Sequence, residues 1–330
     1  MLLVAGVAIL VTVAAADVIR RGFDDESAPP PATTTERVLE GFPQHVFSGR
    51  LVYADELCDV NGVDLATGAE LPLPASDIQS CRGLWTPMSG ELIVVGLLNG
   101  DGEDVSLMLR KGDTGENAAD RPIAAALPES VVTGQGGEIG WCDRRGRGGV
   151  IRSPENEVQR VRGCPAGFLP DGHVIALRGQ KLFVGDELVR TLAPNTFVVG
   201  ISEHRKLAVF QGGTLSVFPA LSNPDPSITV ELPDIAGRPL LAPDGCAILY
   251  PAFDGERATV RLRTLGCGLA TDRDFEVRGS GWRDGEAIWS PDGTWIAISG
   301  PDDSVRLYRS DGGGDPVDLR VPAEYLAWTG

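Results

Sequence analysis

The sequence predicts an all-β protein made of short strands joined by tight turns. Three observations lead to this class. The segment Ile288–Gly300, IWSPDGTWIAISG, has the pattern of two strands around a turn, and similar segments recur along the chain. The 330 residues include 42 Gly and 24 Pro, which favour many turns. Outside the N-terminus, no long amphipathic run predicts a helix.

The turn in this segment is a Pro-Asp-Gly sequence. Pro291 fixes φ at about −65°, Asp292 can hydrogen-bond to its own backbone, and Gly293 tolerates a positive φ. After the turn, residues 295–299 alternate with the period of a strand, and residues 304–309, SVRLYR, do the same. The segment therefore predicts a hairpin followed by a third strand.

The same combination of turn and strands occurs elsewhere in the chain. It is clear in residues 240–263 and 167–184, weaker in 83–97, and weakest in 139–152 and 199–218. The first strands of the repeated units are expected to begin near Gly83, Ile139, Gly167, Val199, Leu240, Ile288 and Tyr325.

This spacing predicts a β-propeller, because a repeat of about 40 residues with four short strands is the period of a propeller blade. Residues 325–328, YLAW, form a strand with no partner after it, whereas residues 50–73 supply later strands of a unit without a first strand. Pairing of these segments closes the ring and removes exposed sheet edges. We predict four-stranded blades over residues 46–330, seven in number; six is the alternative if the unit at Ile139 is an insertion.

The repeat resembles that of a known family. WSPDGTWIAIS, residues 289–299, looks like the repeat of TolB-like propellers, bacterial relatives of the WD-repeat. PDDSVRLYRSDG, residues 301–312, is similar to the strand-turn-strand that ends such a blade. The resemblance implies the propeller fold. It implies little about function, because propellers host both binding scaffolds and several chemistries.

The N-terminal segment is expected to interact with the membrane. Residues 1–16 are uncharged and almost wholly apolar, with a length between that of a signal-peptide core and a full span of about 20 residues. We expect residues 1–22 to be an uncleaved anchor, with cleavage near Ala16 as the alternative. The Pro- and Thr-rich residues 23–45 are expected to be a linker, and residues 46–330 the propeller domain.

The six cysteines form three pairs of sequence neighbours. The pairs Cys58–Cys81, Cys142–Cys164 and Cys246–Cys267 are separated by 23, 22 and 21 residues. A disulfide that closes such a loop stabilises a protein by about 3 kcal/mol. Six cysteines allow fifteen connectivities, so this pairing depends on the repeat. With the apolar N-terminus, it predicts a propeller on the extracytoplasmic side of the cell membrane; the alternative is unpaired thiols in a cytoplasmic protein.

The sequence contains no Gly-x-Ser-x-Gly, His-Glu-x-x-His or Walker motif for catalysis or nucleotide binding. The formal charge of −17 argues against nucleic acid as a partner. Our first hypothesis is a non-enzymatic scaffold, without cofactor or metal, that binds a protein, a peptide or a cell-envelope saccharide. The alternative is a lactonase- or glycosidase-like enzyme, or a carbohydrate-binding domain, with polar groups converging on the channel axis.

The expected binding site is one mouth of the central channel, where loops lead into the innermost strands. The charged residues expected there form a ring of mixed sign that suits a polar peptide or saccharide: Arg82, Glu138, Arg238, Glu286 and Glu324. Five aromatic residues share a register just before the turns and are expected on the innermost strands: Trp85, Trp141, Phe168, Trp289 and Trp328.

Overall fold

A computed structural model gives the structure of the chain. It describes residues 39, 42–43, 46–55, 57–72, 81–87, 92–98, 105–111, 121–152, 157–253, 255–256, 258–266, 272–276, 287–300 and 304–330. The chain divides into two units, Met1–Glu36 and Arg37–Gly330, and every described residue belongs to the second. The expected anchor, residues 1–22, and most of the expected linker, residues 23–45, lie outside the described residues. Within the described ranges, no helix has the length and apolarity needed to cross a membrane.

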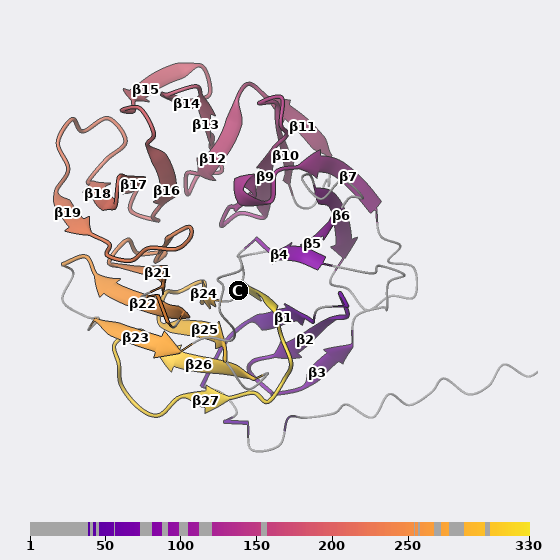
Figure 1. The fold of residues 1–330 in the computed structure, drawn as a ribbon. Helices are drawn as coiled ribbons and strands as arrows, with labels where there is room; N and C mark the ends of the chain where they lie inside the picture. Colours follow the sequence, from indigo (N-terminus) through magenta and orange to yellow (C-terminus); the bar gives the residue numbers. More distant parts are fainter. Residues whose placement is uncertain are drawn as a thin grey trace, which may run out of the picture. The chain divides into compact units, whose positions relative to one another are not determined.

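In the second unit, the described residues form seven four-stranded antiparallel sheets in a ring (Figure 1). Seven blades are therefore confirmed, and the six-blade alternative is wrong. Blade 1 consists of β28 (Tyr325–Thr329), β1 (Arg50–Ala54), β2 (Val60–Asp64) and β3 (Glu70–Pro72). Blade 2 consists of β4 (Cys81–Trp85), β5 (Leu92–Leu98), β6 (Val105–Lys111) and β7 (Arg121–Ala126). Blade 3 consists of β8 (Val132–Thr133), β9 (Glu138–Cys142), β10 (Gly148–Arg152) and β11 (Val158–Val161), preceded by the 3-10 turn η1 (Pro128–Ser130).

The remaining blades follow in chain order. Blade 4 consists of β12 (Cys164–Phe168), β13 (Val174–Arg178), β14 (Lys181–Val184) and β15 (Glu187–Thr191). Blade 5 consists of β16 (Phe197–Ile201), β17 (Leu207–Gln211), β18 (Thr214–Phe218) and β19 (Ile228–Glu231). Blade 6 consists of β20 (Leu240–Leu241), β21 (Ala247–Phe253), β22 (Ala258–Thr264) and β23 (Arg273–Glu276). Blade 7 consists of β24 (Ala287–Trp289), β25 (Trp295–Ser299), β26 (Val305–Arg309) and β27 (Val317–Asp318).

The ring is closed by the last strand, as predicted. β28 pairs antiparallel with β1, with Leu51 opposite Trp328 and Ala54 opposite Tyr325. The hydroxyl of Tyr325 also donates a hydrogen bond of 3.1 Å to the carbonyl of Cys81 in blade 2. The C-terminal strand therefore completes blade 1 and fastens it to the next blade.

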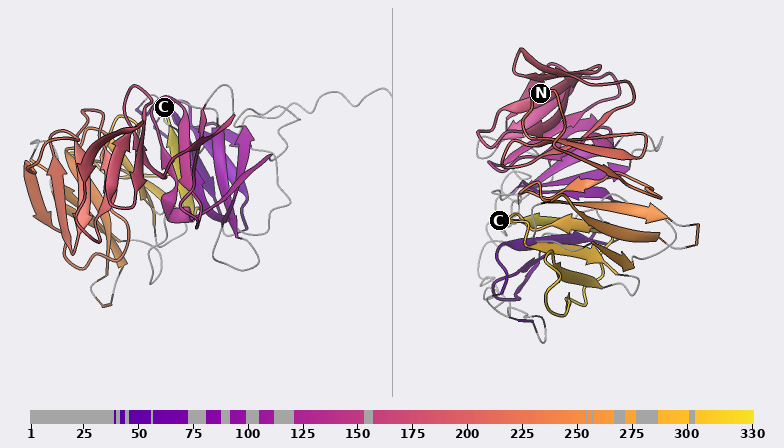
Figure 2. Two further views of the ribbon diagram at one scale, coloured as in Figure 1. Left: turned by 90° about the horizontal axis from the view of Figure 1, so that it is seen from above. Right: turned by 90° about the vertical axis from the view of Figure 1, so that its left-hand side faces the viewer.

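The first strand of each blade lies at the central cavity, and neighbouring first strands run in the same direction. Equivalent positions adjoin between blades: a Cβ on Gly167 would meet Ile201, and a Cβ on Gly200 would meet Leu241. We call the side on which these strands begin the entry face and the side on which they end the exit face. Figure 2 shows the strands running between the two faces.

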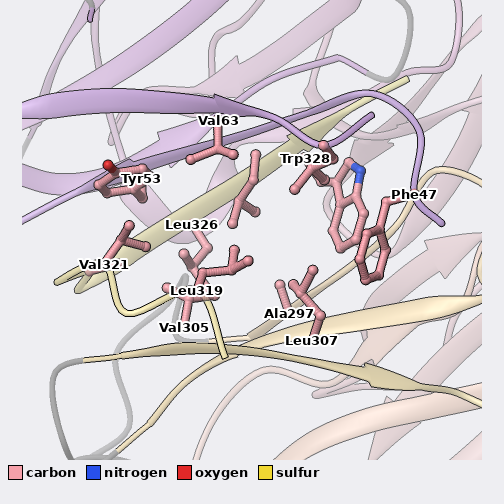
Figure 3. Packing of buried hydrophobic residues seen from close by; sticks show 13 residues of the cluster. Phe47, Tyr53, Val63, Ala297, Val305, Leu307, Leu319, Val321, Leu326 and Trp328 are labelled. Carbon is pink, nitrogen blue, oxygen red and sulfur yellow. The ribbon is translucent and has the colours of Figure 1, made fainter. Parts of the chain in front are cut away.

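Apolar side chains pack between adjacent blades. At the junction of blades 7 and 1, Leu326 and Trp328 of β28 face Val305 and Leu307 of β26, and all four are at most 5% exposed (Figure 3). Phe47 lies beside Trp328 in the same cluster. Burial of each such side chain contributes about 1.5–3 kcal/mol, so this packing stabilises the junction between the two blades.

Four of the five predicted aromatic residues lie on first strands: Trp85 in β4, Phe168 in β12, Trp289 in β24 and Trp328 in β28. The prediction for Trp141 is wrong, because this residue lies on β9, the second strand of blade 3. The first strand of that blade is β8, which has two residues and no aromatic side chain. The aromatic residue in IGWC therefore misled the assignment of Ile139 as the start of a first strand.

The Pro-Asp-Gly turn forms as predicted. One carboxylate oxygen of Asp292 accepts hydrogen bonds from the Ser290 hydroxyl at 2.6 Å and from the Thr294 N–H at 3.1 Å, and Gly293 has φ +70°. Burial acts to raise the pKa of Asp292, but the hydrogen bonds from Ser290 and Thr294 outweigh it, and the pKa is lowered overall.

Two of the three predicted disulfides are confirmed: Cys58–Cys81 and Cys142–Cys164. Both lie on the entry face, and each joins one blade to the next. Cys58 lies in the loop after the second strand β1, and Cys142 ends the second strand β9. Their partners, Cys81 and Cys164, begin the first strands β4 and β12 of the following blades. Such bridges are typical of proteins that fold in an oxidising, extracytoplasmic compartment. Cys267 lies outside the described residues, so the third pair stays a prediction. Cys246, the predicted partner of Cys267, precedes β21 on the exit face, so a similar spacing in the sequence does not mean an equivalent position in the ring.

Candidate functional site

A cavity of about 320 Å³ runs along the centre of the ring. Residues at or next to the first strands of all seven blades line it. A pocket of this size is at the lower end of the range for small-molecule sites. The cavity therefore has room for a small ligand or a narrow chain segment, and not for a folded domain.

Most of the cavity wall is apolar. Its apolar residues include Leu84, Val132, Ile201, Leu241 and Ile288. The described polar residues on the wall are Thr86, Glu129, Thr133, Gln135, Ser202 and Arg238. Among described lining residues, Arg238 is thus the one cationic side chain and Glu129 the one carboxylate.

The aromatic residues of the wall are held by contacts with neighbouring glycines and blades. The Trp85 ring covers β4 and β5, where a Cβ on Gly83 or Gly96 would come within 2.4 or 2.8 Å of it. The Phe168 ring lies against Gly140 of blade 3 in the same way. Glycine at these positions therefore leaves room for the two rings to pack closely against the sheets.

Arg238 and Glu129 meet at the entry face although they come from distant blades. Arg238 lies in the loop before β20 of blade 6, and Glu129 lies in η1 before β8 of blade 3. The Arg238 guanidinium donates a hydrogen bond of 2.5 Å from Nη1 to the backbone carbonyl of Glu129. Blades 3 and 6 have two blades between them on one side of the ring and three on the other, so this contact crosses the mouth of the cavity.

Two other residues of the predicted ring, Arg82 and Glu324, are described and do not line the cavity. Arg82, on β4, is exposed, and Glu324 precedes β28 with its N–H donated to the Ala54 carbonyl at 2.8 Å. Both lie on the entry face, and neither belongs to the cavity wall. Glu286 lies outside the described residues.

The position expected for Glu138 is wrong. It begins β9, the second strand of blade 3, so it lies on the exit face. Its side chain is 6% exposed and accepts a hydrogen bond of 3.0 Å from the Gly136 N–H. Gly172 of blade 4 lies so close that a Cβ there would come within 2.6 Å of the carboxylate. The geometry gives Glu138 a place in the junction of blades 3 and 4.

Sequence reasoning did not find Glu129. Its contribution to the mouth is a backbone carbonyl, which any residue supplies, so no side-chain pattern marks it. The loop leading into β8 was also missed, because the first strand of blade 3 was placed at Ile139. Within the described part of the chain, no group of three or more His, Cys, Asp or Glu side chains is close enough to hold a metal ion.

Comparisons with known proteins identify the fold and no family. No protein-family model and no curated protein matches the chain. Among solved structures, a protein from Bacteroides fragilis assigned as a 6-phosphogluconolactonase has a TM-score of 0.53 at 14% identity, over 91% of this chain and 99% of its own. A protein with the same assignment from Bacteroides uniformis has a TM-score of 0.54 at 12% identity, over 85% and 99%.

TolB from Acinetobacter baumannii is also similar, with a TM-score of 0.50 at 12% identity over 88% of this chain and 69% of its own. The described fold is that of a TolB-like β-propeller, as the repeat in the sequence predicted. At these identities, the likeness concerns the fold alone.

Proposed function

We propose that this chain is a membrane-tethered, extracytoplasmic β-propeller that acts as a binding scaffold without catalysing a reaction. The observation that carries the proposal is the apolar cavity that reaches the entry face beside Arg238. Convergent loops on a rigid ring provide a concave site without disturbing the strands. The partner classes remain those of the sequence hypothesis: a protein, a peptide or a cell-envelope saccharide.

The described residues that precede β1 contact the ring on its exit face. The N–H of Leu39 donates a hydrogen bond of 2.9 Å to the carbonyl of Gly68, in the turn between β2 and β3 on the exit face. A Cβ on Gly68 would meet the Phe42 ring. The two entry-face disulfides support an extracytoplasmic location.

The experiment that tests the scaffold compares capture by matched variants of the full chain. Three proteins are cross-linked in membranes, and the cross-linked products are identified. They are the wild type, the entry-face variant Arg82→Ala/Arg238→Ala and the exit-face variant Arg205→Ala/Arg309→Ala. Each variant removes two positive charges, so the net charge is matched. Loss of the same product from the entry-face variant alone supports the proposal. Equal capture by all three contradicts it, provided that their unfolding midpoints agree.

A propeller enzyme is the second candidate. The likeness of the fold to two proteins assigned as 6-phosphogluconolactonases favours it. The apolar wall of the cavity favours the scaffold, because lactone hydrolysis needs polar groups that activate water and polarise the carbonyl. Hydrolysis of 6-phosphogluconolactone decides between them. A rate that exceeds the buffer rate and falls in Arg238→Gln would establish the enzyme in place of the scaffold.

A further inference from the structure

We infer that the entry face carries a second contact surface, a basic corner at the junction of blades 3 and 4, that binds an acidic cell-envelope polysaccharide. This inference rests on the proposed binding function and names one of its partner classes. The basic corner consists of five exposed cationic residues: Arg145, Arg147, Arg160, Arg162 and Lys181. Residues 143–181 contain eight Lys or Arg and four Asp or Glu, whereas the whole chain contains 29 and 46. The corner therefore reverses the charge of the protein.

The five cations come from three segments on the entry face of two neighbouring blades (Figure 1). Arg145 and Arg147 lie in the turn that joins β9 to β10. Arg160 lies near the end of β11, and Arg162 directly follows that strand. Lys181 begins β14 of blade 4, after the hairpin from β13.

Contacts between the two blades place these segments side by side. A Cβ on Gly148, which follows the first turn, would come within 2.1 Å of the Gly163 carbonyl oxygen. Arg178, at the end of β13, donates a hydrogen bond of 3.0 Å from Nε to the Arg162 carbonyl. The disulfide between β9 and β12 joins the same two blades. The cations of both blades therefore gather in one part of the entry face.

The basic corner has charges available for a partner. Asp143 pairs with Arg147 at 2.5 Å, and Asp186 lies 4.0 Å from Arg162. The remaining three cations make no side-chain ion pair with a described residue: Arg145, Arg160 and Lys181. An anionic partner can therefore bind them without displacing a described carboxylate. Guanidinium groups accept such a partner well, because they donate two parallel hydrogen bonds to a carboxylate.

The surface around these charges favours a polar polymer over a folded protein. Protein interfaces usually have an apolar or aromatic centre. None of the large apolar side chains that are exposed among the described residues lies in the turn 143–147, at 162–163 or in the hairpin 178–181. Charges spread over three segments suit a linear polyanion, which carries an anionic group on successive units.

A polysaccharide meets these conditions better than an acidic peptide. Its sugar rings restrict the polymer, so it loses less conformational freedom on binding than a peptide of equal charge. Its hydroxyl groups stay hydrated on an exposed surface, which avoids the cost of burying them. The disulfide inside the corner agrees with an extracytoplasmic location, where envelope saccharides are accessible.

The test measures binding of fluorescent decagalacturonate, an oligosaccharide with one carboxylate on each ring, to the full chain in phosphatidylcholine nanodiscs by fluorescence anisotropy. Its methyl ester has the same rings without the charge, and decaglutamate has the same repeated carboxylates without the rings. The corner variant is Arg145→Gln/Arg160→Gln. The matched control, Arg50→Gln/Arg320→Gln, removes two exposed arginines that lie outside the corner and do not line the cavity.

We expect the corner variant to bind decagalacturonate about 5- to 20-fold more weakly, because each exposed ion pair lost accounts for about two- to fivefold. The matched control should bind as the wild type in about 0.15 M salt, which screens distant charges. Asp186→Asn should bind about two- to threefold more tightly, because it removes a carboxylate that competes for Arg162.

Equal binding of the methyl ester, or equal effects of the two double variants at equal unfolding midpoints, would overturn the inference. Decaglutamate that binds as tightly as decagalacturonate would also overturn it, because the corner would then be a site for acidic peptides. If decagalacturonate fails to bind while the cross-linked product of the proposed scaffold persists, the basic corner is not a saccharide surface and the scaffold stands.

Discussion

The indole N–H of Trp289 in β24 donates a hydrogen bond of 3.2 Å to the backbone carbonyl of Leu240 in β20. This contact joins blade 7 to blade 6 beside the cavity, and the Trp289 ring packs against the apolar cluster between them. One side chain therefore contributes to the blade junction and to the cavity wall. Disturbing it should affect the stability of the whole ring.

Trp289→Ala should lower the free energy of unfolding by about 3 kcal/mol, at the low end of the range for aromatic truncation because the side chain is half-buried. Trp289→Phe keeps much of the packing but loses the N–H donor, and should cost about 1 kcal/mol. Urea unfolding of the full chain measures both. An unchanged midpoint for Trp289→Ala would show that the junction does not depend on this residue.

Removal of either entry-face disulfide should destabilise the ring by about 3 kcal/mol, because each closes a loop of just over twenty residues and joins two blades. The double variants Cys58→Ala/Cys81→Ala and Cys142→Ala/Cys164→Ala should have similar effects, since the bridges occupy equivalent positions. Mass spectrometry of a non-reduced digest should identify both bridges, and a Cys246–Cys267 bridge if the third prediction holds. Six free thiols would contradict the proposed compartment.

The lowered pKa of Asp292 predicts an acid-dependent loss of stability. A carboxyl group whose pKa is lower in the folded state stabilises the protein above its unfolded pKa of about 3.9. That contribution is lost as the pH falls through the folded pKa. The stability of Asp292→Asn should therefore depend less steeply on pH below about pH 4 than that of the wild type. Asp315→Asn, at an exposed loop position, is the control, and identical acid dependence in all three proteins would contradict the prediction.

Removal of residues 325–330 should prevent folding of the ring. Without β28, Leu51 and Val63 lose their apolar neighbours, and β1 has an unpaired edge. Circular dichroism and gel filtration should show an aggregated or largely unfolded product. Deletion of Gly330 alone keeps β28 and should fold normally. A folded, monomeric protein after the longer deletion would show that closure is dispensable.

Much of the fold was predictable because local chemistry marks most blades. Pro291, Asp292 and Gly293 define a turn whatever lies around them, and the alternation after the turn defines the strand. Blade 3 lacks this signal: β8 is two residues long, and the aromatic residue lies on its second strand as Trp141. The ring places β8 at the axis through contacts with other blades, which a local pattern does not record.

The candidate site was less predictable. Arg238 was identified from its place before a first strand, and the structure brings it to the mouth. Its acceptor, the carbonyl of Glu129, depends on where the backbone of η1 runs and not on a side chain. Glu138 was assigned to the mouth through the same error of strand order that affected Trp141. To place residues at the mouth correctly, one must therefore know which strand of each blade is the innermost.

The pairing of β28 with β1 has a consequence for genetics. Blade 1 receives its innermost strand from residues 325–329, so a chain that stops before them lacks that strand wherever the stop falls. No shorter version closes into a smaller ring through this contact. Premature stop codons upstream of Tyr325 should therefore share one phenotype, independent of their position. In a linear repeat protein, by contrast, the loss of stability would increase with the number of repeats lost.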